Sequence, residues 1–200
     1  MKRALLCVVA MAAAAHAGEV MDTQVTNDGG HYAVRFDVRL AASPERIKRY
    51  LTDYAHYADY FSSVRESQVL THEPDGAMRV RLVFYSCVIF FCRDVTFVKD
   101  ISETPDGAIV ARIVPAQSDF SEATEQWRIS PDDGQTRLQY RAALVPTFFV
   151  PPVIGPWLLK LKIRDSLESG ADKLEALARG DAASSRKRSE PIGDNPMGTR

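Results

Sequence analysis

The chain has little of the chemistry on which many enzyme families rely. Its 200 residues include three cysteines and four histidines. No histidine stands at a metal-binding spacing, or in a motif with a nucleophilic serine or cysteine. The sequence also lacks a phosphate-binding glycine loop and a dinucleotide-binding fingerprint. We therefore predict no catalytic residue, no metal ligand and no cofactor.

An excess of charge of one sign is also missing. The 25 lysines and arginines nearly balance the 26 aspartates and glutamates, and the formal net charge is −1. Proteins that bind nucleic acids usually concentrate basic residues on one face. The composition therefore predicts no nucleic-acid partner, and it does not identify a protein partner.

The N-terminal apolar run is too short to span a bilayer. It extends from Ala4 to Ala15, follows the basic residues Lys2 and Arg3, and ends in the small-x-small site that Ala17 completes. This pattern predicts a signal peptide over residues 1–17, cleaved after Ala17, and export to the periplasm. An uncleaved N-terminal anchor is the alternative.

The rest of the chain has the composition of one globular domain. Hydrophobic residues make up 46% of the sequence, which is enough for a sizeable core. We expect an N-terminal segment over 18–31, a domain over 32–180 and a disordered tail over 181–200. The basic run 186–188 in that tail could contact an anionic membrane, although a solvated tail is favoured because three charges bind weakly.

Apolar and polar residues alternate in about seven segments, which predicts an antiparallel sheet. Proline, aspartate and glycine recur together between several of these segments, as is typical of tight turns. The predicted strands do not alternate with helices along the chain, so a parallel sheet is not expected. The predicted strands are 34–40, 64–71, 78–87, 92–102, 109–115, 122–129 and 137–145.

A helix is expected directly after the first strand. Ser43 can accept a hydrogen bond from a free amide at the helix start, and Pro44 suits the first helical position. Ile47 and Leu51 belong to the apolar face of this helix. The segment 54–61 is rich in aromatic residues and predicts a second, short helix.

The C-terminal region has the clearest helical period in the chain. Pro156 suits the first turn of this helix and Gly180 suits its end. Gly170 lies in the apolar stripe and costs about 1 kcal/mol of helix propensity relative to alanine. We expect it to leave a gap for a ligand or to allow close contact with the sheet. The stripe consists of Leu159, Ile163, Leu167, Gly170, Leu174 and Leu177.

Two cysteines remain after residue 17. A hairpin turn centred on Ile89 and Phe90 places Cys87 opposite Cys92, at a spacing that a disulfide can bridge. An exported protein meets an oxidising compartment, so a cross-strand disulfide is the favoured prediction. Two buried free thiols, or a metal or redox pair, are the alternatives.

Three segments together resemble a known superfamily. They are "ASPERIKRYLTDYAHYADYF" after the first strand, the strand meander that follows, and the ending "VPTFFVPPVIGPWLLKLKIRDSLESGADKLEALA". Over roughly residues 32–179 the chain resembles the START-like superfamily, which includes coenzyme Q-binding START proteins, polyketide cyclases and Bet v 1-type allergens. The resemblance implies an α+β helix-grip fold, in which a curved antiparallel sheet of about seven strands wraps around a long C-terminal helix. It also implies an apolar cavity between the sheet and that helix.

The alternation of the strands indicates which side chains would face such a cavity. Without the resemblance, the same residues would be expected to fill an ordinary core. Glu125 and Trp127 are two positions apart, so their side chains face the same side of the predicted strand. Glu125 could therefore orient a ligand or lie at the rim of the cavity. The apolar segment 148–154 could form a gate, dip into a membrane or fold back on the core. The predicted cavity wall and gate residues are Leu82, Phe84, Phe97, Trp127, Tyr140, Phe148, Phe149, Leu159, Ile163 and Leu167.

These observations lead to a functional expectation. The chain is expected to be an exported protein that binds or carries an apolar small molecule without changing it. A lipid, an isoprenoid quinone or a polyketide-like molecule would suit the cavity, and transient contact with a membrane would deliver it. A cyclase or dehydratase on the same scaffold is one alternative. A periplasmic interaction protein with a filled core is the other.

Overall fold

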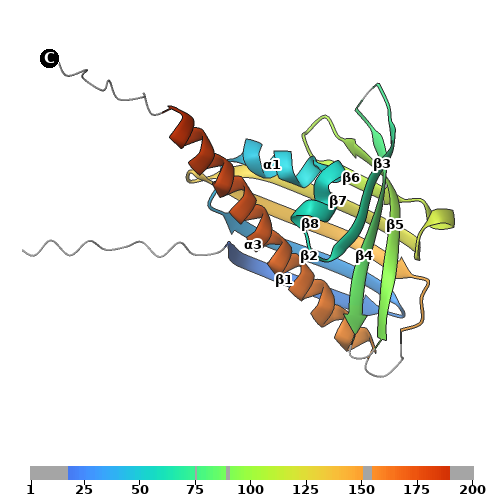
Figure 1. Cartoon of the computed structure of the whole chain (residues 1–200). Coiled ribbons are helices and arrows are strands. Elements are labelled where there is room, and N and C mark those ends of the chain that lie inside the picture. The colour runs from blue at the N-terminus through green and yellow to red at the C-terminus, as the bar shows by residue number, and fades with distance from the viewer. Residues whose placement is uncertain (1–17, 75, 89–90, 151–154, 190–200) are drawn as a thin grey trace, which may run out of the picture.

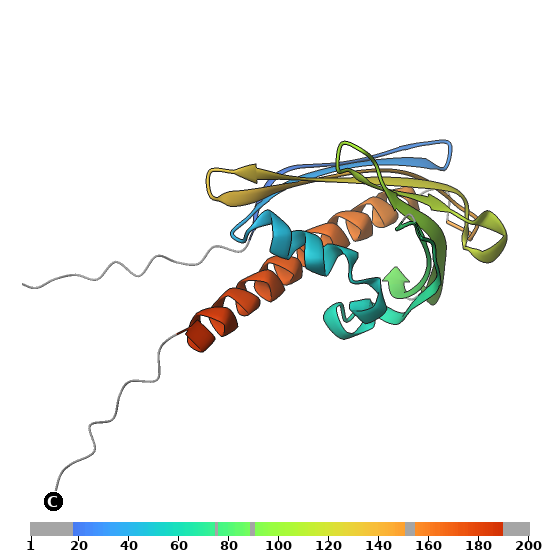
Figure 2. The ribbon, with the colours of Figure 1, turned by 90° about the horizontal axis from the view of Figure 1, so that it is seen from above.

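One curved antiparallel sheet and one long helix dominate the molecule. The computed structural model describes residues 18–74, 76–88, 91–150 and 155–189. The eight strands of its sheet follow the order β1-β2-β8-β7-β6-β5-β4-β3. The helices α1 and α3 lie on the same face of the sheet (Figures 1 and 2). The expected helix-grip architecture is therefore confirmed. The predicted signal peptide lies outside the described residues.

The elements follow one another as a long meander with two helical insertions. The strands are β1 Glu19–Asp28, β2 His31–Leu40, β3 Val64–His72, β4 Met78–Val88, β5 Phe91–Glu103, β6 Ile109–Ile113, β7 Phe120–Asp132 and β8 Gln135–Pro146. The helices are α1 Pro44–Thr52, α2 Tyr57–Tyr60 and α3 Gly155–Ser189, with 3-10 turns at Tyr54–His56 and Pro115–Gln117.

The strand β1 is the element that the sequence did not predict. It occupies most of the segment 18–31 and pairs with β2 at the edge of the sheet. Most of its side chains are exposed and the rest are only half-buried. An edge strand of this kind needs no alternating apolar face, so its sequence lacks the pattern by which the other strands are recognised.

The hairpin of β4 and β5 has the register expected from the sequence. Cys87 pairs with Cys92, and Arg79 pairs with Asp100. Cys87 and Cys92 form a disulfide, with their Cα atoms 4.0 Å apart. The predicted cross-strand bridge is thus present, and the turn residues 89–90 lie outside the described part of the chain.

The helix α1 begins where the sequence indicates, but not through the predicted side-chain cap. Pro44 is its first residue and Ser43 is the capping position, yet the Ser43 side chain makes no capping hydrogen bond. The backbone carbonyl of Ser43 instead accepts hydrogen bonds from the amides of Arg46 and Ile47, both at 3.1 Å. Burial of Ile47 and Leu51 then fixes the helix on the sheet.

The helix α3 is longer than predicted. It begins at Gly155 and continues past Gly180 to Ser189, so Gly180 does not end it. The first part of the predicted disordered tail is therefore helical, while residues 190–200 lie outside the described ones. Five of the nine residues 181–189 are alanine, arginine or lysine, which favour helix.

The densest packing lies where α1 and the second half of α3 meet β2 and β8. Leu40, Ile47, Leu138, Leu174 and Ala178 are almost fully buried and belong to one apolar cluster. The first half of α3 packs less closely against the sheet and borders the site described below. None of the helices in the described ranges is long and apolar enough to cross a membrane.

Candidate functional site

A cavity of about 1020 Å³ lies between the concave face of the sheet and α3. Apolar and aromatic side chains from β2, β4, β5, β7 and β8 form one wall, and α3 forms another. All of the cavity and gate residues predicted from the sequence line it. These are Leu82, Phe84, Phe97, Trp127, Tyr140, Phe148, Phe149, Leu159, Ile163 and Leu167.

Aromatic rings make the sheet wall continuous. The Phe97 ring meets the Phe84 ring edge-on, with centroids 5.4 Å apart, and lies 4.4 Å from the Phe120 ring. Trp127 and Tyr140 are directly paired on neighbouring strands, and their rings stack at 4.0 Å. Such pairs hold one another in fixed orientations. These rings therefore give much of the sheet wall a fixed shape, and aliphatic side chains such as Leu82 and Leu138 complete it.

Gly170 leaves a gap in the helical wall. A Cβ atom built on this residue would meet no other heavy atom within 4 Å. Gly170 nevertheless lines the cavity, between the lining residues Leu167 and Ala171. Of the two expectations for this glycine, close contact with the sheet is therefore wrong, and a gap that widens the cavity is observed.

One buried ion pair interrupts the apolar lining. The Lys99 ammonium on β5 lies 2.7 Å from a carboxylate oxygen of Glu125 on β7. Their side chains are only 11% and 8% exposed, and both line the cavity. The sequence indicated Glu125 as a candidate orienting group, but not Lys99. Lys99 follows Phe97 by two positions, so strand alternation puts both side chains on the same face of β5. This relation could have identified Lys99 as a cavity residue.

Three tyrosines surround this polar point. Tyr54, Tyr57 and Tyr140 all line the cavity. Burial raises the pKa of each hydroxyl, and the negative charge of Glu125 raises all three pKa values further. The Tyr57 hydroxyl donates to the Leu51 carbonyl. At neutral pH the tyrosines therefore stay protonated, so this part of the cavity holds a balanced ion pair among neutral hydroxyls.

Asp53 fixes the aromatic segment that closes one side of the cavity. One of its carboxylate oxygens lies 2.7 Å from Nδ1 of His56, and the other accepts a 2.6 Å hydrogen bond from the Tyr60 hydroxyl. That hydrogen bond raises the pKa of Tyr60 to about 12. Tyr60 and Phe61 line the cavity, so this polar contact positions part of its wall.

The mouth of the cavity is marked by residues that both line it and face solvent. Phe149 is 83% exposed and Tyr85 is 40% exposed. Phe148 turns inward instead, with its ring 5.9 Å from Phe120 and beneath the Arg93 guanidinium at 4.8 Å. The predicted gate is thus divided between an inward and an outward phenylalanine. Val150 of the predicted gate also lines the cavity, and its remaining residues, 151–154, lie outside the described ones.

The disulfide lies beside this mouth. Cys92 lines the cavity, and the next residue, Arg93, covers the Phe148 ring. The bridge ties the ends of β4 and β5 together where they pass the mouth. Among the residues that the structure describes, no cluster of His, Cys, Asp and Glu side chains could hold a metal ion.

Comparisons with known proteins place this geometry among related folds. The family described as polyketide cyclase/dehydrase and lipid transport matches residues 31–179. A START superfamily protein from Mycobacterium smegmatis is 23% identical, with a TM-score of 0.61 over 76% of this chain and 99% of that chain. A search of curated protein sequences finds no match.

Two further solved structures have the same architecture. The Zhui aromatase/cyclase from Streptomyces sp. R1128 is 19% identical, with a TM-score of 0.57 over 82% of this chain and 98% of that chain. A STAR-related lipid transfer protein from Xanthomonas axonopodis is 19% identical, with a TM-score of 0.56 over 78% and 98%. At these identities the likeness shows the fold alone.

Proposed function

This chain belongs to the polyketide cyclase/dehydrase and lipid transport family, and on that basis we propose that it binds and carries an apolar small molecule in its cavity. The observation that carries the proposal is the cavity of about 1020 Å³, lined mainly by apolar and aromatic groups. Each ligand CH₂ buried there contributes about 0.8 kcal/mol. A cavity of this size also counts against a filled core, and therefore against a pure interaction protein.

The buried ion pair limits the chemistry of the ligand. Lys99 and Glu125 already balance one another's charge at 2.7 Å. A ligand with a further full charge next to this pair would be buried there without a counter-ion, which is costly. A neutral carbonyl or hydroxyl can instead exchange hydrogen bonds with the ammonium, the carboxylate or the Tyr54 hydroxyl. We therefore favour a long apolar molecule with a neutral polar end, such as a quinone or an uncharged lipid.

A second candidate function is a cyclase or dehydratase on the same scaffold. The matching family is described by both activities, and the cavity of this chain contains a lysine, a carboxylate and protonated tyrosines. Such groups can move protons during a ring closure or a loss of water. Turnover of a polyketide-like substrate by the purified protein, lost in Glu125→Gln, would favour this candidate over a carrier.

Export is part of the proposal. The basic, apolar and small-x-small pattern of residues 1–17 supports cleavage after Ala17 and a periplasmic location. The Cys87–Cys92 disulfide agrees with this because such bonds persist in oxidising compartments. The mass of the protein recovered from the periplasm tests both points. It should correspond to a chain that begins at Gly18 and lacks two thiol hydrogens.

The binding proposal is tested by filling the gap at Gly170. Gly170→Phe would place a ring in the cavity, and nothing within 4 Å obstructs its first carbon. Gly180→Phe is the matched control, because Gly180 lies in the same helix, is exposed and is equally unobstructed. Native mass spectrometry of the protein from its own periplasm, followed by organic extraction, would show what each variant retains.

We expect a stoichiometric apolar ligand in the wild type and in Gly180→Phe, and its loss in Gly170→Phe. Replacing a helical glycine also raises helix propensity, so Gly170→Phe should remain folded. Bare wild-type protein that takes up no added lipid or quinone would contradict the proposal. Retention of the ligand by Gly170→Phe would place the ligand outside this cavity.

A further inference from the structure

The first turns of α3 present an exposed apolar face that no other element covers in the described structure. Trp157 is 61% exposed and Leu161 is 46% exposed. They are separated by four positions, so they lie one above the other on the helix. Lys160 and Arg164 fall on the same side, at three and seven positions after Trp157. This face therefore combines a large aromatic ring, an aliphatic side chain and two cations.

The opposite side of the same turns lines the cavity. Leu158, Leu159 and Lys162 are lining residues, whereas Trp157 and Leu161 are not. Phe149, which precedes the helix, is both a lining residue and 83% exposed. Phe149 thus lies at the mouth of the cavity, and Trp157 and Leu161 lie on the outer side of the helix that begins six residues later.

The sequence that leads into α3 and forms its first turns is basic. The sequence contains no acidic residue between Gly134 and Arg164, while Lys160, Lys162 and Arg164 add three positive charges to the start of α3. Asp165 is the first acid that follows, and it pairs with Lys162 at 3.5 Å. Tryptophan beside lysine and arginine on one helix face is typical of segments that lie in an anionic membrane interface.

We propose that the face formed by Phe149, Trp157, Lys160 and Leu161, here called the docking face, binds the surface of an anionic lipid bilayer. Its apolar side chains enter the boundary between headgroups and acyl chains, and Lys160 meets the lipid charge. Because Phe149 belongs both to this face and to the cavity lining, docking brings the mouth of the cavity to the edge of the lipid contact. The role of this contact rests on the proposed carrier function. In that role, an apolar ligand passes between the bilayer and the cavity without crossing water.

Vesicle binding by the mature protein tests this inference directly. The vesicles consist of phosphatidylcholine alone, or of phosphatidylcholine mixed with phosphatidylglycerol, and the bound fraction is measured by co-sedimentation. In a Trp127→Phe background Trp157 is the only tryptophan, since the chain has two. Its emission should shift to the blue on the mixed vesicles and be quenched by brominated lipid.

Single substitutions identify the surface. We expect Trp157→Ala and Leu161→Ser each to lower the partition coefficient about tenfold, because binding follows the apolar area that is buried. Lys160→Glu should remove most of the preference for phosphatidylglycerol. Leu70→Ser is the matched control, because Leu70 is 39% exposed on β3 and lies outside the docking face and the cavity lining.

Three results would overturn the proposal. The wild type could ignore both kinds of vesicle, or Leu70→Ser could weaken binding as much as Leu161→Ser. The wild type could also self-associate through Trp157 and Leu161 without binding lipid, which would make this face a protein interface. Uptake of the uncharged dye N-phenyl-1-naphthylamine in the absence of vesicles separates the two proposals. Dye uptake without vesicle binding contradicts docking alone, and vesicle binding without dye uptake contradicts the carrier cavity alone.

Discussion

A carboxylate oxygen of Glu175 accepts a hydrogen bond of 2.8 Å from the backbone amide of Ala41. Glu175 lies on α3 and is only 3% exposed, while Ala41 belongs to the link between β2 and α1. The other carboxylate oxygen of Glu175 lies 3.3 Å from the Arg179 guanidinium. The second half of α3 is therefore fixed to the sheet by a buried polar contact, and the first half is left to form the cavity wall.

Glu175→Leu should destabilise the protein measurably. The substitution removes the acceptor of a partly buried backbone amide, and such a loss costs about 1–3 kcal/mol. Glu175→Gln keeps a carbonyl oxygen at this place and should cost less. Urea denaturation gives the free energy of unfolding of each variant. Glu168→Leu serves as a control, because Glu168 forms an ion pair with Arg164 at the surface of the same helix. Equal losses in Glu175→Leu and Glu168→Leu would refute the anchoring role.

The strands that are buried on one face could be predicted from the sequence, whereas β1 could not. Residues such as Val34 and Phe36 alternate with exposed neighbours, so their period identifies β2. The edge strand β1 buries no side chain fully, and of its alternating half-buried residues Thr23, Val25 and Asn27 only one is apolar. Its position is decided by pairing with β2, which is a relation between distant backbone groups that side-chain patterns do not record.

The cavity residues could be predicted, but the cavity could not. Phe84 and Trp127 face inward whether they pack against a neighbour or surround empty space, because alternation fixes the direction of a side chain and not its distance from the next one. The open space beside Gly170 appears only when α3 is placed over the sheet. Similarly, Lys99 is recognised as a cavity residue once Glu125 is seen across the intervening strand β6.

Breaking the Lys99–Glu125 pair should be far more damaging than removing both partners. Glu125→Leu would leave a buried ammonium without its counter-ion, which typically costs about 3–5 kcal/mol. The double variant Lys99→Met/Glu125→Leu leaves no buried charge and should regain most of this loss. Thermal and urea denaturation of both single variants and of the double variant give the coupling energy.

An exposed ion pair serves as the comparison for the buried Lys99–Glu125 pair. Arg128 and Asp106 lie 2.7 Å apart with side chains about half exposed. Asp106→Ala should therefore change the free energy of unfolding by less than about 1 kcal/mol. A Lys99–Glu125 coupling as small as this would show that the cavity is wet enough to screen the buried pair, and would weaken its proposed role in orienting a ligand.

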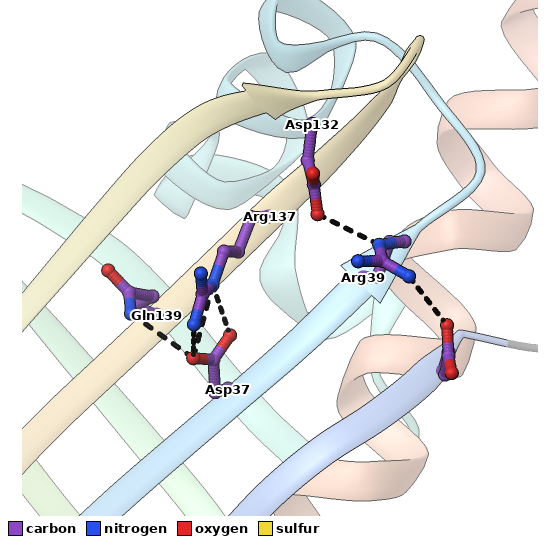
Figure 3. A network of polar contacts seen from close by, with 6 residues as sticks. Asp37, Arg39, Asp132, Arg137 and Gln139 are labelled. Carbon is purple, nitrogen blue, oxygen red and sulfur yellow. Dashed lines mark hydrogen bonds and ion pairs between the residues drawn. The ribbon is translucent and has the colours of Figure 1, made fainter.

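The outer face of the sheet gives a prediction for acid conditions. Asp37 on β2 accepts hydrogen bonds from Arg137 and Gln139 on β8, with the shortest Arg137 contact at 2.5 Å (Figure 3). The Arg137 hydrogen bond is the main cause that holds the pKa of Asp37 below its ordinary value of 3.8. This carboxylate therefore stabilises the folded chain while it is ionised, and the stabilisation falls as it becomes protonated.

The pH dependence of Asp37→Asn relative to wild type tests this contact. Because the folded pKa of Asp37 lies below the unfolded one, its contribution is complete above the unfolded value and is lost as pH falls through the folded value. We expect a difference of about 1 kcal/mol in the free energy of unfolding near neutral pH, shrinking toward pH 2. An unchanged difference at pH 2 would mean that the side-chain shape of Asp37, and not its charge, stabilises the sheet. NMR titration of the carboxyl group gives the folded pKa independently, and a value at or above 3.8 would contradict the role assigned to Arg137.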